Sequence, residues 1–134
     1  MIIEINDSKT LSEISNEFTR IFPGLKIEFF SRSHRPSKAA LASNLLSKEL
    51  SVKDAMGNHN AGACIIEGTD SVKDIKHRFD EQFGLNIGIF RKTGENWIEI
   101  TKTSNLTLKD QIALFRESEQ KTEPEIIPFE EEVE

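Results

Sequence analysis

The stretch that decides the fold is FGLNIGIFRKTGENWIEI, residues 83–100, because a weaker copy of its opening, FPGLKIEFF, occurs at residues 22–30. Before each stretch, apolar residues recur at spacings of 3, 4 and 4 residues, as on one face of a helix. After a glycine, Gly24 or Gly84, they alternate with a period of two, which is typical of a strand. An offset of 61 residues superposes Leu11 on Val72, Ile14 on Ile75, Phe18 on Phe79 and Phe22 on Phe83, and one gap at Pro23 aligns the strands.

Each copy also begins with a short apolar segment, MIIEI at residues 1–5 and ACIIE at residues 63–67, which predicts a further strand. Two strand–helix–strand units in series give the order β-α-β-β-α-β. That order is typical of a ferredoxin-like sandwich, an α+β fold with two helices on one face of a sheet. We therefore expect one domain over residues 1–118, built of two related halves at about 2–58 and 63–118.

The sequence at the end of the second copy predicts a hairpin and a further helix. Alternating segments at 85–92 and 95–102 flank Thr93 and Gly94, which indicates a hairpin. A two-residue loop at Thr93 and Gly94 would place Phe90 opposite Trp97, and a longer loop would keep both on one face. A helix is expected from about 107 to 118, and the similarity of ELSVKDAM at 49–56 to NLTLKDQI at 105–112 suggests that the repeat includes it.

The segment FRKTGENWIEITKTSNLTLKDQ, residues 90–111, resembles the closing phrase of a small bacterial protein family without an established function. In that phrase FRK, a glycine turn, a tryptophan strand and an L-T-L helix start follow one another, after a helix similar to SVKDIKHRFDEQFGL. The resemblance covers residues 65–111 well and residues 10–30 faintly. It implies a shared scaffold and supplies no catalytic residues.

Charge is distributed unevenly along the 134 residues, whose formal net charge is −6. Residues 117–134 carry eight glutamates and one lysine, so the rest of the chain has a net charge of +1. Residues 20–48 form a basic region, and we expect residues 119–134 to be an acidic, flexible tail. Because the sequence contains neither a long apolar run nor an export signal, we expect a cytoplasmic protein that does not enter a membrane.

The sequence gives little indication of catalysis. Cys64 begins an apolar strand, where a small buried residue is the usual interpretation, and His77 lies on the polar face of a predicted helix. His59 and Cys64 have neither the number nor the spacing of zinc ligands. Because no phosphate-binding loop or hydrolase motif is present, we predict no enzyme activity, no cofactor and no metal.

Three features are candidates for binding. The alternation places Phe30, Phe90 and Trp97 on one sheet face, where a partner or the last helix would cover them. Arg32, Arg35 and Lys38 could approach phosphates, although a polar surface loop is the simpler interpretation. Ile126, Ile127 and Phe129 stand among glutamates, as in a docking peptide, in a segment that could equally be a solubilising tail.

We therefore predict a non-enzymatic interaction module that binds another protein, or a second copy as a homodimer, through the sheet face or the hydrophobic-acidic tail. The alternative is a nucleic-acid-binding domain that uses basic residues 20–48. RNA-recognition domains carry their aromatic residues on the two central strands, and neither IIEI nor ACIIE contains one.

Overall fold

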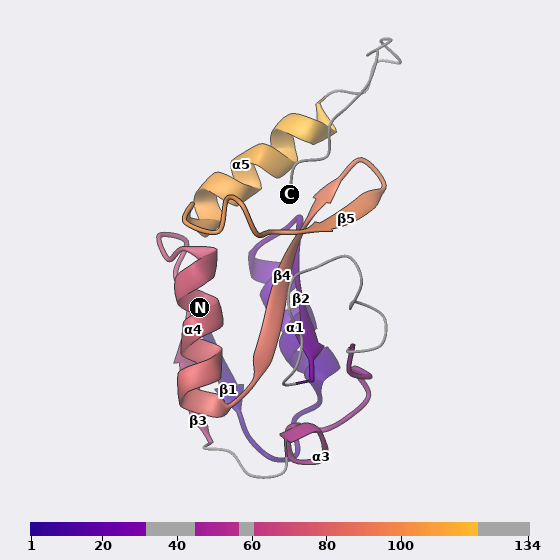
Figure 1. The fold of residues 1–134 in the computed structure, drawn as a ribbon, viewed down its shortest axis with the longest axis vertical. Helices are drawn as coiled ribbons and strands as arrows, with labels where there is room; N and C mark the ends of the chain where they lie inside the picture. The colour runs from indigo at the N-terminus through magenta and orange to yellow at the C-terminus, as the bar shows by residue number, and fades with distance from the viewer. Residues whose placement is uncertain (32–44, 57–60, 121–134) are drawn as a thin grey trace.

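The computed structural model describes residues 1–31, 45–56 and 61–120 (Figure 1). In chain order the elements are β1 (Ile2–Ile5), α1 (Leu11–Ile21), β2 (Leu25–Phe30), α3 (Val52–Met56), β3 (Gly62–Ile65), α4 (Val72–Phe83), β4 (Asn86–Thr93), β5 (Asn96–Glu99) and α5 (Leu108–Glu119). The two predicted strand–helix–strand units are thus present as β1-α1-β2 and β3-α4-β4. The α+β class is confirmed.

The strands form two antiparallel sheets. Strand β1 pairs with β3, and the second sheet has the order β2-β4-β5. A ferredoxin-like sandwich would join the four strands of the two units in one sheet, so that part of the prediction is not confirmed. Here corresponding strands of the two units pair with each other, and the order of elements along the chain does not specify that choice.

Both ladders are centred on residues that the sequence repeat makes equivalent. Ile3 pairs with Cys64, 61 residues later, and Glu28 pairs with Gly88, its equivalent after the gap at Pro23. An antiparallel ladder centred on equivalent positions is what an approximate two-fold axis between the units requires. The registers of both ladders meet this condition.

A set of four backbone hydrogen bonds recurs in both halves and attaches the start of each long helix to the segment before the next helix. In the first half, for example, the N–H of Leu11 donates to the carbonyl of Leu50, and in the second the N–H of Val72 donates to Leu106. The matched donor–acceptor pairs are Leu11–Leu50 with Val72–Leu106, Ser12–Lys48 with Lys73–Ser104, Val52–Lys9 with Leu108–Asp70, and Lys53–Asp7 with Lys109–Gly68.

Side-chain caps fix where the helices begin. Thr10, Ser71 and Thr107 each accept a hydrogen bond from the backbone N–H three residues later, at the starts of α1, α4 and α5. Helix α4 ends at Gly84, whose φ of 67° is left-handed. Each long helix therefore has a defined start.

The apolar faces of both halves meet in one core. Phe18 of α1 and Phe79 of α4 are fully buried in the same cluster, together with the inward-facing residues of both sheets. The expected common interior is present. Of the predicted tail 119–134, Glu119 ends helix α5, and the residues after Gln120 lie outside the described residues.

The hairpin loop lies one residue later than expected. Thr93 pairs with Asn96, so Gly94 and Glu95 form the loop, and Lys92 rather than Phe90 faces Trp97. Gly94 has a φ of 64°, as a type II′ turn requires at its first central position. Every pair across the ladder moves by two residues, and therefore Phe90 and Trp97 stay on one face.

Helix α5 is fixed to the end of the second sheet by a buried polar contact. Gln111 is fully buried, its side-chain oxygen accepts from Arg91 of β4, and its side-chain nitrogen donates to the carbonyl of Thr103 at 2.9 Å. Further along, the ring of Phe115 lies directly against Gly24. In Figure 1, α5 crosses this end of the sheet beside the β4–β5 hairpin.

Candidate functional site

The three-stranded sheet turns one face to the core and the other outward. The outward face, called here the aromatic face, carries Lys26, Glu28 and Phe30 of β2, Gly88, Phe90 and Lys92 of β4, and Trp97 and Glu99 of β5. These residues alternate with buried ones such as Ile27 and Ile89. The alternation predicted this face correctly.

Gly88 allows two phenylalanine rings to approach each other across this face. The rings of Phe30 and Phe90 stack with their centroids 6.4 Å apart. A Cβ atom at position 88 would lie 3.0 Å from the Phe30 ring and 2.6 Å from a carboxylate oxygen of Glu99. A side chain there would therefore push Phe30 or Glu99 out of position.

Lys26 links the second ring to Trp97. Its ammonium group lies 5.8 Å from the centroid of Phe90 and 4.6 Å from that of Trp97, within the range of a cation–π contact. The same ammonium group is 3.2 Å from Glu28, which also pairs with Lys48 at 3.3 Å. The Lys26 ammonium group thus covers one face of the Trp97 ring.

The three predicted aromatic residues lie together but are unequally accessible. Phe30 is 2% exposed, Phe90 is half-buried, and Trp97 is 37% exposed. Direct contact with a partner is therefore available mainly to Trp97. Sequence reasoning missed Lys26, whose position opposite Phe90 depends on the β2–β4 register.

Leu45 adds an exposed apolar side chain at the other edge of this sheet. It bridges to Phe30, is 46% exposed, and the N–H of the following Leu46 donates to the carbonyl of Phe29 at 2.9 Å. The carbonyl of Ser31 accepts from Asn86 at 2.8 Å. The two described ends of the gap at 32–44, Ser31 and Leu45, therefore both lie beside Phe30.

The other predicted binding residues lie outside the described residues. Arg32, Arg35 and Lys38 fall in the segment 32–44, and Ile126, Ile127 and Phe129 fall in the segment 121–134. Of the basic region 20–48, the described Lys26 and Lys48 are both paired with Glu28. The nucleic-acid interpretation thus stays a prediction.

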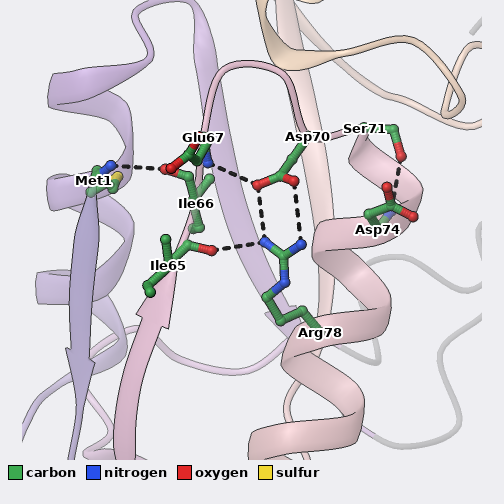
Figure 2. A network of polar contacts seen from close by, with 8 residues as sticks. All are labelled: Met1, Ile65, Ile66, Glu67, Asp70, Ser71, Asp74 and Arg78. Carbon is green, nitrogen blue, oxygen red and sulfur yellow. Dashed lines mark hydrogen bonds and ion pairs between the residues drawn. The ribbon is translucent and has the colours of Figure 1, made fainter.

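A polar network joins β3 to the start of α4 (Figure 2). The guanidinium of Arg78 donates to both carboxylate oxygens of Asp70, at 3.0 and 3.3 Å, and to the carbonyl of Ile65 at 2.8 Å. The hydrogen bond from Arg78 lowers the pKa of Asp70, and Asp70 in turn raises the pKa of Arg78. Asp70 also accepts from the N–H of Glu67 at 2.8 Å.

This network covers the outer edge of strand β3. Met1 and Ile66 exchange both backbone hydrogen bonds across the β1–β3 ladder, so the carbonyl of Ile65 points to the opposite edge of β3. Arg78 occupies that edge, which limits pairing with another strand. The equivalent positions of the first half, Lys9 and Glu17, form an ion pair of reversed polarity at 2.8 Å.

A shallow hollow of about 370 Å³ lies beside this network, lined by Ala63, Ile65, Glu67, Asp70, Arg78 and Gln82. Two of its three charged side chains, Asp70 and Arg78, are already paired with each other. We therefore assign this cluster a structural role.

Two described side chains, those of Cys64 and His77, are of the types that could act as a nucleophile or a base. Cys64 is fully buried, and burial raises the pKa of its thiol, which opposes formation of a thiolate. His77 is exposed on α4. Among the described residues, no group of three or more His, Cys, Asp or Glu side chains is arranged to hold a metal ion.

Comparison with known proteins did not identify a relative of this chain. No protein-family model matches the sequence, and neither the curated proteins nor the solved structures gave a match. The resemblance of residues 90–111 to a bacterial family therefore stays a prediction. None of the helices in the described ranges is both long and apolar enough to span a membrane.

Proposed function

We propose that this chain is a non-enzymatic interaction module that binds another protein, or a second copy of itself, through the aromatic face. The observation that carries the proposal is Trp97, whose ring is held by Lys26 and yet is 37% exposed beside Phe90. Binding energy in protein interfaces is concentrated in a few aromatic and arginine anchors. A ring that is already ordered loses little further conformational entropy when a partner covers it.

The aromatic face is favoured over the other exposed apolar site. On the outer side of the β1–β3 sheet, Ile2 and Ile65 are paired and largely exposed. Their neighbours on that side are Glu4 and the small Ala63, so the apolar area is limited to two side chains. Isolated exposed apolar side chains are ordinary on protein surfaces.

The arrangement favours a protein partner over single-stranded nucleic acid. Base stacking needs open ring faces, but Lys26 occupies one face of Trp97 and Phe30 is buried. Lys26 and Lys48 are also partly neutralised by Glu28. The nucleic-acid alternative fails if titration of the full chain with single-stranded RNA and DNA at low salt gives no binding signal.

We also propose how the fold arose and where in the cell the protein is located. The recurring backbone hydrogen bonds and the ladders centred on equivalent residues support a duplication of one β-α-β unit together with the helix that follows it. A cytoplasmic location remains part of the proposal.

The test compares two substitutions that remove equally exposed apolar side chains. Trp97→Ala removes the proposed anchor, and Leu106→Ala removes a side chain that is also 37% exposed but lies outside the aromatic face. Self-association is measured by sedimentation over a range of concentrations, and partner capture is measured by affinity purification with each variant as bait.

We expect Trp97→Ala to cost about 2 kcal/mol of binding free energy or more, which weakens association roughly thirtyfold, whereas Leu106→Ala should behave as the unsubstituted chain does. Equal association by all three proteins would contradict the proposed function.

A further inference from the structure

We propose that a second copy of the chain pairs antiparallel with the outer edge of β1, which joins two two-stranded β1–β3 sheets into one four-stranded sheet. This contact is called here the β1 interface. It is separate from the aromatic face, so the inference goes beyond the proposed function and does not depend on it.

The register of the β1–β3 ladder decides which backbone groups of β1 face outward. Met1 and Ile66 exchange both of their backbone hydrogen bonds, so Ile2 and Glu4 turn their N–H and C=O groups away from β3. Within residues 1–31, 45–56 and 61–120, no group is hydrogen-bonded to these outward groups. Both residues are exposed to solvent. The outer edge of β1 is therefore able to pair with a further strand.

The outer edge of β2, by contrast, is closed by helix α1. The carbonyl of Leu25 accepts from the hydroxyl of Thr19, and the carbonyl of Ile27 accepts from the hydroxyl of Ser15, both at 2.9 Å. Covering an edge with a helix is one of the ways in which proteins prevent pairing with another chain. No side chain of α1 makes such a bond to β1, and both elements are fully described.

The edges of β1 and β3 differ because the charges at equivalent positions are reversed. On β3, the guanidinium of Arg78 donates to the carbonyl of Ile65 at 2.8 Å, and Figure 2 shows it at that edge. The position equivalent to Arg78 in the first half is Glu17, whose carboxylate has no proton to donate to the carbonyl of Glu4. Lys9 pairs with Glu17 at 2.8 Å. One edge of the two-stranded sheet is thus closed and the other is open.

The sequence of β1 is its own complement in one antiparallel register. If two copies of β1 pair about a two-fold axis at Ile3, Ile2 of each copy lies opposite Glu4 of the other, and all of the outward N–H and C=O groups of these residues become hydrogen-bonded. A register centred on Glu4 would place two carboxylates directly opposite each other, which is unfavourable. The register centred on Ile3 is therefore preferred.

The exposed isoleucines favour a second copy as the occupant of this edge. Ile2 and Ile65 are paired on the outer face and are 63% and 55% exposed. In the register centred on Ile3, Ile2 of one copy lies diagonally across from Ile2 of the other, within reach of a side-chain contact. The two apolar pairs, each too small to form an interface alone, thus become one continuous strip.

The closed edge of β3 limits the assembly to two copies. Each copy brings one open edge, at β1, and one edge of the same sheet that Arg78 closes, so the joined sheet ends in a closed edge on both sides. Because two four-residue strands form the contact, we expect it to bury less than the roughly 800 Å² per partner that is typical of stable complexes. The dimer should therefore dissociate on dilution.

A proline at position 4 tests the β1 interface without a change in the core. Glu4→Pro removes an outward N–H and leaves the ladder intact, because the N–H of Glu4 points away from β3. Ala63→Pro is the matched control, since Ala63 pairs with Glu4 and its N–H points to the closed edge of β3. Both variants and the unsubstituted chain are compared by sedimentation over a range of concentrations. Circular dichroism checks that each variant keeps the fold.

We expect the unsubstituted chain and Ala63→Pro to dimerise equally. Glu4→Pro should weaken dimerisation at least about tenfold, because each copy loses a hydrogen bond to the other and the proline ring blocks close approach of the strands. Equal dimerisation by Glu4→Pro and the unsubstituted chain overturns the proposal, and so does an unsubstituted chain that stays monomeric at every concentration.

Hydrogen exchange of the unsubstituted chain is a second test that needs no substitution. The amide of Glu4 should exchange several-fold more slowly at high than at low protein concentration, whereas exchange at Ala63 should not depend on concentration. If sedimentation shows a dimer but exchange at Glu4 does not depend on concentration, the dimer uses another surface and the β1 interface is wrong.

These experiments separate the β1 interface from the aromatic face. Dimerisation that is lost in Trp97→Ala and kept in Glu4→Pro overturns the β1 interface and supports the proposed function. Dimerisation that is lost in Glu4→Pro and kept in Trp97→Ala supports the β1 interface, and capture of another protein then decides whether the aromatic face is a binding surface.

Discussion

Gly24 and Gly94 both have positive φ angles, of 88° and 64°, but only Gly24 lies against a side chain. A Cβ atom at position 24 would overlap the Phe115 ring, whereas nothing lies within 4 Å of one at position 94. The two glycines therefore separate the cost of a strained backbone from the cost of a steric clash.

We predict that Gly94→Ala lowers the free energy of unfolding by about 1 kcal/mol, through backbone strain alone. Gly24→Ala should lower it by about 3 kcal/mol, because Phe115 must also move. Denaturant unfolding of both variants measures the difference. Equal losses would mean that α5 does not pack on Gly24 as described.

The Asp70–Arg78 pair makes a prediction about pH. Because the folded-state pKa of Asp70 is lowered, its stabilisation is present above the ordinary aspartate pKa of about 3.9 and is lost as pH falls through the folded-state value. The side chain of Asp70 is 21% exposed, so solvent reduces the strength of the pair.

Asp70→Asn should therefore lower the free energy of unfolding by about 1 kcal/mol at pH 7, and this difference should shrink below about pH 4. Asp80→Asn, on an exposed position of α4, is the control and should have little effect. Chemical denaturation at several pH values measures both. A loss that is the same at pH 7 and pH 2.5 would rule out the ion pair as its source.

At the scale of elements, the buried polar side chain Gln111 is one of the contacts that hold α5 against the second sheet. Gln111→Ala removes the acceptor of the Arg91 guanidinium and a donor to Thr103, so we expect a loss of about 2–3 kcal/mol. Glu117→Ala, on an exposed position of the same helix, should change stability by less than about 0.5 kcal/mol.

Hydrogen exchange locates this effect. The α5 amides should exchange faster in Gln111→Ala than the amides of α1, because α1 is anchored separately by Thr10 and by Leu50. Equal acceleration of exchange in both helices would contradict the idea that the loss of Gln111 destabilises α5 and leaves α1 unaffected.

Most elements could be predicted from the sequence, but their partners could not. The change of period at Gly24 and Gly84 located α1-β2 and α4-β4, and Thr107 marked the start of α5. Alternation defines the faces of a strand but not its neighbours, so β1–β3 and β2–β4 pairing was not anticipated. The hairpin register was wrong because Gly94 occupies the first central position of the turn rather than the second.

The candidate site was predictable to a similar extent. Alternation placed Phe30, Phe90 and Trp97 on one face, and that placement holds through the shifted register. The burial of Phe30 and the contact between Lys26 and Trp97 depend on strand pairing, which composition and spacing do not reveal. The reversed ion pairs Lys9–Glu17 and Asp70–Arg78 could have been found by applying the repeat offset to charged residues.

At the scale of the whole molecule, two similar halves share one core and differ on their surfaces. The hairpin with Trp97 belongs to the second half, and the corresponding place in the first half is the bridge from Phe30 to Leu45. The core thus involves both halves, whereas the feature proposed for binding is one that the two halves do not share.

The central claim is that another polypeptide contacts the aromatic face at Trp97, and photo-crosslinking tests it most directly. A photoreactive residue is placed at Glu95, an exposed position of the hairpin loop, or at Leu106 as a control outside the face. We predict that position 95 yields covalent adducts with a polypeptide, that Trp97→Ala abolishes them, and that position 106 yields none. No adduct from position 95, or adducts from it that persist in Trp97→Ala, would contradict the account.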